Sequence, residues 1–368
     1  MSELSAAKAS DTFGRTLMQA LAKEEPGKNL FVSPLSLFIT LAMTANGAAL
    51  ETRRSLLMGM NLPDNLKVSN AACSELLQAL TQPETGIEMG LANALWAFAP
   101  HRFLPAVRAR IQESFGAELR DVKWQTAAPE INSWAADKTR QMVKDVVTPR
   151  DFNYLTAFAL SNAAYFKGLW TTPFDPKYTR PMPFQSRGSA PRMVPMMQAA
   201  MPVECAFGPK FDAIRLPYGK GRFQLYAFLP APDQTPEGLL PDLPLFQDSW
   251  RRTLSSVRIR LAFPKLMLDL PRLELMPTLS KLSLLGNNDL TPMENEEKKG
   301  MLEIAKVFHK TKLEIDEAGT RAAAATVVVI QGRGGGGPRP VYFNRPFVLS
   351  LVDEKSQTSL FTGVIYDP

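Results

Sequence analysis

The most informative stretch of this chain is Glu317-Ala318-Gly319-Thr320-Arg321-Ala322-Ala323-Ala324-Ala325-Thr326. It continues through three valines and Ile330 into Gln331-Gly332-Arg333-Gly334-Gly335-Gly336-Gly337-Pro338. The four alanines favour a helix, the β-branched run favours a strand, and the glycines favour neither. Such a conflict of local preferences is typical of a functional or bistable segment.

The chain before this segment is rich in helices first and in strands later. Apolar residues recur at helical spacing in three places, namely 6–21, 34–57 and 131–147. Ser33-Pro34 indicates a helix start, and Pro149 should end the third helix. Strands are predicted at Phe158–Phe166, Phe223–Leu229 and Val257–Phe263, and after the segment at Val341–Val352 and Leu360–Tyr366.

Composition places the chain among ordinary globular proteins, with 45% hydrophobic and 21% charged residues. No apolar run reaches the roughly 20 residues of a membrane helix, so we expect no contact with a membrane. The two cysteines, Cys73 and Cys205, are too few for a disulfide framework or a metal site, and we expect buried thiols and no cofactor. The first residues show no basic leader followed by an apolar run, so the protein either stays inside the cell or has lost a leader.

The net charge of +6 permits attraction to polyanions, but the basic residues are dispersed along the chain. Arg251, Arg252, Arg258 and Arg260 form the densest group and are a weak candidate for polyanion binding. Gly332-Arg333-Gly334-Gly335 is similar to one RGG unit, but a single copy is poor evidence for nucleic-acid binding, which we do not expect. An enzyme is also disfavoured, because the chain has two histidines and no Gly-x-Ser-x-Gly motif.

The segment at 317–326 resembles the hinge of the serpin family, Glu-x-Gly-Thr-x-Ala-Ala-Ala-Ala-Thr. Phe343-Asn344-Arg345-Pro346-Phe347 is similar to the signature that follows it. Further matches occur in the family's order at Asn29–Ser36, Asn162–Trp170, Val194–Met197, Leu216–Tyr218 and Phe263–Lys265. The resemblance covers nearly the whole chain. It implies an α+β serpin fold, with about nine helices around three β-sheets, a single domain over residues 1–368, a monomer, and an exposed mobile reactive loop at about 317–340.

Two positions depart from the family pattern. Leu50 stands where a glycine is usual, which affects a connection between helices. Arg321 stands where the hinge often has Glu or Gln. In a strand over 320–330 side chains alternate between two faces, and Arg321 then falls on the face opposite Thr320, Ala322 and Ala324. The hinge residues Glu317, Gly319, Thr320, Ala322, Ala323, Ala324, Ala325 and Thr326 are therefore compatible with insertion into a sheet.

The family spacing from Gly319 puts the scissile bond between Arg333 and Gly334. The chemistry of the residues supports the same bond, because Arg333 is the one charged residue between Ala322 and Pro338, and Arg339 precedes a proline. An arginine suits a primary pocket with an acidic floor. The resemblance thus implies a suicide-substrate inhibitor of a trypsin-like serine protease that prefers Arg. The alternative is a non-inhibitory serpin-fold carrier or chaperone.

The resemblance also assigns two regions that control insertion. Ser33, Ser36, Asn162 and His309 match the shutter, which controls the opening of the main sheet. Trp170, Lys265 and Glu317 match the breach, where insertion begins, and Lys265 and Glu317 are expected to form an ion pair worth about 0–1 kcal/mol.

Overall fold

The structure is a computed structural model of the chain. It describes residues 6–186, 188, 190–245, 247–285, 288–294, 302–319 and 338–368. The hinge residues from Thr320 to Thr326 and the bond between Arg333 and Gly334 lie outside the described residues, so the assignments made for them stay predictions.

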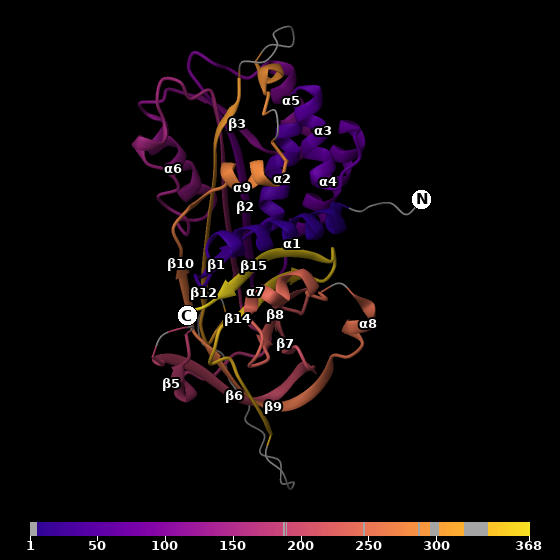
Figure 1. Ribbon diagram of the computed structural model, residues 1–368, viewed down its shortest axis with the longest axis vertical. Helices are drawn as coiled ribbons and strands as arrows, with labels where there is room; N and C mark the ends of the chain where they lie inside the picture. Colours follow the sequence, from indigo (N-terminus) through magenta and orange to yellow (C-terminus); the bar gives the residue numbers. More distant parts are fainter. Residues whose placement is uncertain are drawn as a thin grey trace.

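Nine α-helices occur in the described part of the chain. They are α1 (Ala6–Glu24), α2 (Pro34–Ala45), α3 (Leu50–Gly59), α4 (Leu66–Leu80), α5 (Pro105–Phe115), α6 (Ala127–Lys138), α7 (Pro236–Leu239), α8 (Asp248–Arg251) and α9 (Met276–Lys281). Figure 1 shows α2–α5 on one side of a long sheet and α6 on its other side. None of the described helices is long and apolar enough to cross a membrane.

The long sheet has six strands and is called here the main sheet. Its order is β10 (Leu266–Asp269), β12 (Ile304–Ile315), β4 (Phe158–Gly168), β2 (Ile87–Phe98) and β3 (Glu118–Val122), with β11 (Leu273–Glu274) also paired to β12. Strands β12 and β4 run parallel, and their register pairs His309 with Asn162 and Lys312 with Tyr165. The outer neighbours β10 and β2 are antiparallel to β12 and β4.

The second sheet has nine strands. Its order is β1 (Leu30–Val32), β15 (Thr358–Ile365), β14 (Phe347–Asp353), β8 (Phe223–Pro230), β7 (Phe211–Tyr218), β6 (Arg192–Phe207), β9 (Ser255–Pro264) and β13 (Arg339–Tyr342), with β5 (Arg180–Phe184) paired to β6. The α+β class is confirmed. The second and third of the expected sheets form one hydrogen-bonded network here, because the 16-residue β6 pairs with β7 at one end and with β9 and β5 elsewhere.

One helix prediction was wrong in its extent. The helix expected over 131–147 begins earlier and ends at Lys138, and Arg140, Gln141 and Asp145 have positive φ. Side chains hold this irregular segment, because the backbone of Val147 exchanges two hydrogen bonds with the amide of Asn132. The apolar residues that suggested a helix are still buried, because they pack with α6 on the outer face of the main sheet.

Another predicted helical stretch, 34–57, is two helices. Ser33 caps α2 as expected, since its hydroxyl accepts a hydrogen bond from the Ser36 backbone at 3.3 Å. Leu50 begins α3 and is half exposed, so the departure from the family pattern lies at the connection between α2 and α3.

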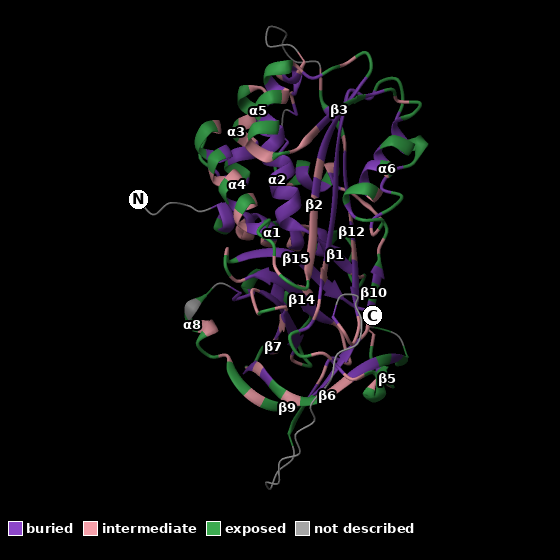
Figure 2. Ribbon diagram, turned by 180° about the vertical axis from the view of Figure 1, so that it is seen from behind, coloured by how far each residue is buried: buried purple, intermediate pink, exposed green. Residues whose placement is uncertain are grey.

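Apolar side chains cover the inner face of the main sheet and part of its outer face, and Figure 2 shows that most of the strands at its centre are buried. The inner face packs against α2 and the second sheet and shares their large core. The outer face carries a smaller cluster with α6, in which Trp96 and Trp134 meet edge to face at 5.7 Å. Cys73 and Cys205 are buried as expected, and burial raises the pKa of their thiols to about 12 and about 11.

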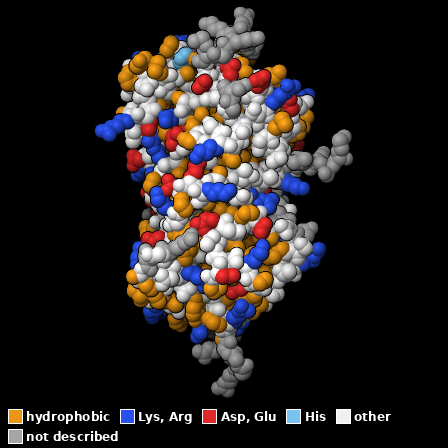
Figure 3. Space-filling model, in the orientation of Figure 1, with side chains coloured by type: hydrophobic (Ala, Val, Ile, Leu, Met, Phe, Trp, Pro, Cys, Tyr) orange, Lys and Arg blue, Asp and Glu red, His pale blue; other side chains and the backbone are white. Residues whose placement is uncertain are grey.

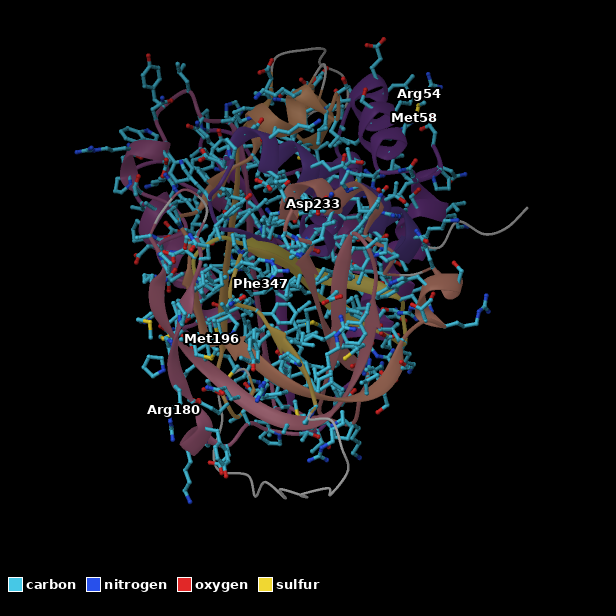
Figure 4. The ribbon with its side chains drawn as sticks, turned by 60° about the horizontal axis from the view of Figure 1, so that its bottom comes forward. Arg54, Met58, Arg180, Met196, Asp233 and Phe347 are labelled. Atoms are coloured by element: carbon cyan, nitrogen blue, oxygen red, sulfur yellow. The ribbon has the colours of Figure 1, made fainter. Side chains whose placement is uncertain are left out.

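The motif at 343–347 anchors the chain where it leaves the predicted loop. Phe343 and Phe347 are buried and lie 5.1 and 5.6 Å from the ring of Phe263 on β9. The guanidinium of Arg345 donates to the carbonyl of Pro230 at 2.7 Å. Figure 4 shows Phe347 within the molecule and Arg180 on its outer edge. Strand β13, which directly follows the predicted loop, is thereby held at one end of the molecule.

Candidate strand-insertion site

The line between β4 and β12 is called here the seam, and a buried polar cluster closes it from the inner side. His309 on β12 and Asn162 on β4 lie opposite each other, and His309 Nδ1 is 2.5 Å from Asn162 Oδ1. The amide of Asn162 also donates to the hydroxyls of Ser36 and Thr40 on α2. All of these side chains are fully buried. The hydrogen bonds therefore tie the two strands to each other and to α2.

Ser33 connects His309 to the start of α2. Its backbone N–H donates to His309 Nε2 at 3.0 Å, and its hydroxyl donates to the carbonyl of Leu360 at 2.7 Å. Because Nε2 accepts, the proton of the neutral ring is on Nδ1, which donates to Asn162. Burial lowers the pKa of His309 to about 3, since a charged ring would lose its hydration. A second proton on the ring would also place two donors, Nε2–H and the Ser33 N–H, opposite each other.

The structure thus brings together the four residues assigned to the shutter by resemblance. Sequence reasoning missed two further members of the cluster, Asn93 and Thr40. Asn93 on β2 accepts from Ser36 at 3.0 Å, from Thr40 at 2.9 Å and from Asn162 at 2.5 Å. The signal that could have found Asn93 is its isolation as the one polar side chain in the run Leu91–Phe98.

At one end of the seam the backbone of Gly319 already lies between the two strands. Gly319 forms antiparallel bridges with both Leu169, just after β4, and Asp316, just after β12. The β4–β12 register, continued past Lys312 and Tyr165, places Leu169 opposite Asp316. The two bridges therefore describe a single register. Gly319 occupies the position of the first residue of a strand between β4 and β12.

Only glycine fits this position. Its φ is +136°, and a Cβ there would lie 2.2 Å from the carbonyl oxygen of Gly168 and 2.7 Å from the nitrogen of Trp170. Both atoms belong to backbone that is held in the sheet, so neither can move away cheaply.

The residues assigned to the breach surround Gly319. The Trp170 backbone N–H donates to Ala318 O at 3.0 Å, and its indole N–H donates to Asp316 O at 2.9 Å. The indole is buried and stacks on Tyr218 with ring centroids 4.1 Å apart. Trp170 therefore fixes the backbone on both sides of Glu317.

The expected ion pair is present, with Lys265 Nζ 2.8 Å from Glu317 Oε2. Thr179, which the sequence did not single out, donates to the other carboxylate oxygen at 2.6 Å. Burial by itself would raise the pKa of Glu317, but the hydrogen bonds from Lys265 and Thr179 outweigh it and hold the pKa below its usual value. The pair is more buried than the surface pair that we expected, since the Glu317 side chain is 12% exposed.

The fold and this site define a class of protein in which one residue, Gly319, already bridges the ends of two parallel strands of the main sheet. A family model described as Serpin (serine protease inhibitor) matches residues 8–368. The chain therefore belongs to the serpin family, as the sequence motifs indicated, and serpins are protease inhibitors rather than enzymes, although some members do not inhibit.

Individual relatives agree with this result. Human Serpin B9 is 28% identical over 98% of this chain and 98% of its own length. Serine protease inhibitor 42Dd of Drosophila melanogaster is 29% identical over 96% of this chain and 95% of its own. The structure of human thyroxine-binding globulin in complex with thyroxine covers 99% of this chain and 98% of that one, with a TM-score of 0.88 and 22% identity, which shows the shared fold.

The buried His309 leads to a prediction about pH. The unfolded chain protonates His309 near pH 6.5, whereas the folded protein does not do so until about pH 3. The unfolded state therefore binds more protons in this range, and stability falls as the pH is lowered from 6.5 toward 3, by up to about 1.4 kcal/mol per pH unit. His309→Gln should unfold at a lower urea concentration than the unmodified protein at pH 7, and the difference should shrink at pH 5.

The matched control is His101→Gln, because His101 lies outside the cluster and contacts Glu294. The urea midpoint of His101→Gln at pH 7 should stay closer to that of the unmodified protein than the midpoint of His309→Gln does, because His101 is only partly buried. Urea midpoints of His309→Gln and the unmodified protein that stay equally far apart from pH 7 to pH 5 would contradict the assignment.

Proposed function

We propose that this chain is a suicide-substrate inhibitor of trypsin-like serine proteases that is cleaved between Arg333 and Gly334. The observation that carries the proposal is the double bridge of Gly319 to Leu169 and Asp316. After cleavage the residues that follow Gly319 extend the same register and enter the seam. In this reading residues 1–368 act as one inhibitory unit.

Insertion along this register would replace the hydrogen-bonded ladder between β4 and β12 with two ladders, one on each side of the entering strand. The entering strand turns back at 316–319, so it runs antiparallel to β12 and also to β4, which is parallel to β12. One parallel ladder is lost and two antiparallel ladders form, each slightly more stable per residue than a parallel one. The twelve residues from Thr320 to Gln331 equal the twelve residues of β12. The gain in hydrogen bonds supplies the driving force.

The inner face of the seam suits the hinge sequence. In the register set by Gly319, Ala324 falls between Thr311 and Ala164, both buried against the large core. Thr326 falls between His309 and Asn162, so its hydroxyl would lie beside the two side chains whose hydrogen bond insertion breaks. The other inner-face residues of the hinge are alanines and Thr320, so this face would receive small side chains and two hydroxyls and no charge.

The outer face accounts for Arg321. In the same register Arg321 falls between Glu314 on β12 and Lys167 on β4. Glu314 is paired with Lys312 at 2.8 Å, and Glu88 is paired with both Lys167 and Arg140. This part of the outer face therefore already carries charged side chains of both signs. A charge at Arg321 can stay hydrated there, whereas the inner face would bury it.

Farther along the seam the outer face becomes apolar. In the same register Val327 would fall beside Phe308, which belongs to the cluster beneath α6. The hinge sequence would therefore carry Arg321 where the outer face is charged and Val327 where that face is covered. Each local choice agrees with a single inserted strand.

The reaction itself follows the protease's own chemistry. The serine Oγ attacks the carbonyl carbon of Arg333, the bond to the nitrogen of Gly334 breaks, and that nitrogen leaves as a new amino terminus. The ester to Arg333 remains. Insertion then carries the attached protease along the main sheet and distorts it before water can hydrolyse the ester. Inhibition is a race between insertion and hydrolysis, so the starting fold is held by a kinetic barrier.

Incubation with a substoichiometric amount of trypsin tests the proposal. We expect a covalent complex that survives denaturing electrophoresis and a released peptide that begins at Gly334 by mass spectrometry. Arg333→Ala should lose the complex with trypsin, because the primary pocket no longer finds a cation. Cleavage after Arg333 without any complex would instead favour a non-inhibitory serpin such as a carrier, for which the likeness to thyroxine-binding globulin provides a precedent.

A matched pair of hinge variants tests the register. Ala324→Glu places a carboxylate between Thr311 and Ala164 in the core, which costs several kcal/mol and slows insertion. Ala323→Glu places it on the outer face beside Lys312 and Tyr165. We expect Ala324→Glu to be cleaved as a substrate with at least tenfold less complex per cleavage event, and Ala323→Glu to keep most of its inhibition. Equal behaviour of the two variants would refute the register.

A further inference from the structure

Strand β9 carries two arginines side by side on its outward face. Arg258 and Arg260 are exposed, whereas Ile259 and Leu261 between and after them are fully buried. This alternation fixes both guanidinium groups on one surface of the second sheet. The dense group of four arginines in the sequence is therefore divided by the fold. Arg251 turns away from it and pairs with Glu354 at 2.8 Å.

Small side chains and prolines flank these two arginines on the neighbouring strands. The strand register places Pro202 beside Arg258 and both Ala200 and Pro340 beside Arg260. The guanidinium of Arg260 lies over the ring of Tyr342, 5.9 Å from its centroid. We call the surface formed by Arg258, Arg260, Tyr342, Ala200, Pro202 and Pro340 the arginine face.

Two acidic side chains on the neighbouring described strands, Glu204 and Asp212, are each paired with another arginine. On the paired strands, Glu204 lies on the same side, opposite Ser256, and is bound by Arg215. Asp212 lies 3.7 Å from Arg339, whose own guanidinium packs over Phe207. At the lower end of the view in Figure 3 the visible charged side chains are mostly Lys and Arg. The arginine face therefore presents net positive charge to any partner at this end of the molecule.

The arginine face lies within reach of the proposed reactive bond. Arg339, at the start of β13, pairs with Ile259, which stands between the two arginines. Arg339 is five positions after Gly334 in the sequence, and a chain spans at most about 3.6 Å per residue, so the bond lies within about 18 Å of this strand. A protease domain of roughly 240 residues has a radius of gyration of about 18 Å and extends well beyond that distance from its centre. A protease seated on the bond therefore overhangs the arginine face.

We infer that the arginine face is a docking surface for an acidic patch beside the active-site cleft of the target protease. The inference rests on the proposed function and adds a second criterion of selectivity to Arg333. This criterion is needed, because the glycines around Arg333 offer a protease no side chains to recognise. Two guanidinium groups on a rigid strand match a small carboxylate patch, whereas a long polyanion gains its affinity from many cations in a row. Charges at the rim of such an interface act mainly on the association rate.

The test compares anionic and cationic trypsin, which share the Arg-directed pocket and differ in surface charge. We expect the unmodified protein to inhibit anionic trypsin faster at about 0.05 M salt, and the preference to fade at about 0.5 M salt as screening shortens the range of the charges. Arg258→Glu with Arg260→Glu should slow the inhibition of anionic trypsin by about tenfold at low salt. The same variant should inhibit cationic trypsin at an unchanged or higher rate.

The control variant makes the same change of charge elsewhere. Lys67→Glu with Arg102→Glu alters exposed residues on α4 and just before α5, helices that lie away from β9 in Figure 1. It should leave both rates within about twofold. Arg258→Gln with Arg260→Gln, which removes charge without reversing it, should give an intermediate loss and serves if the double Glu variant does not fold.

Three results would overturn the inference. Rates that change equally for the two trypsins would show that the arginines do not sense protease charge. Unchanged rates together with lost retention on a heparin column would assign the face to a polyanion instead. If neither trypsin forms a covalent complex with the unmodified protein, the proposed function and the docking surface both fail. If complexes form but their rates do not depend on the charge of the trypsin, only the docking surface fails.

Discussion

The parallel ladder between β4 and β12 is the feature on which the rest of this structure depends. It joins two strands that are each antiparallel to their outer neighbours, so it is the place where one more strand can enter and leave every pair antiparallel. The large core lies against the inner side of this seam, and α6 with the irregular segment after it covers part of the outer side. The core is thus fully packed, although the main sheet still has room in its hydrogen-bonding pattern for one more strand between β4 and β12.

What holds the seam closed is polar rather than apolar. His309, Asn162 and the hydroxyls of α2 form a buried network in which each member is satisfied by another. Such a network is strong when intact and costly when half broken, so it opens as a unit. A hydroxyl at the position of Thr326 would give the separated partners a new neighbour. In the proposed mechanism, the same buried network resists opening before cleavage and accepts a strand after it.

The charged side chains of this molecule differ in how deeply they are buried and in whether they form ion pairs. Glu317 and Lys265 pair at the end of the seam, where Thr179 and the backbone around Trp170 hold them. Arg251 forms an ion pair with Glu354, whereas Arg258 and Arg260, a few residues later in the chain, face outward. The difference arises because β9 alternates and the turn before it does not. The arginines that are close together in the sequence therefore have two roles, because Arg251 forms an ion pair and Arg258 and Arg260 form the arginine face.

The sequence by itself determined the family, the segment that matters and most of the residues around it. Motifs such as the one at 343–347 are local, and the alternation of strand residues is a short-range property, so the strands at Phe158–Phe166 and Val257–Phe263 could be predicted within a few residues. The sequence could not predict Asn93 or Thr179 as partners, because each contacts a side chain distant in the chain. It also missed the end of α6 at Lys138, because the apolar spacing continues through an irregular segment that the side chain of Asn132 holds. Only the tertiary structure decided the register in which Gly319 bridges both strands of the seam, since that register needs two strands about 150 residues apart to lie side by side. From that register alone follow the neighbours proposed for Arg321, Ala324 and Thr326.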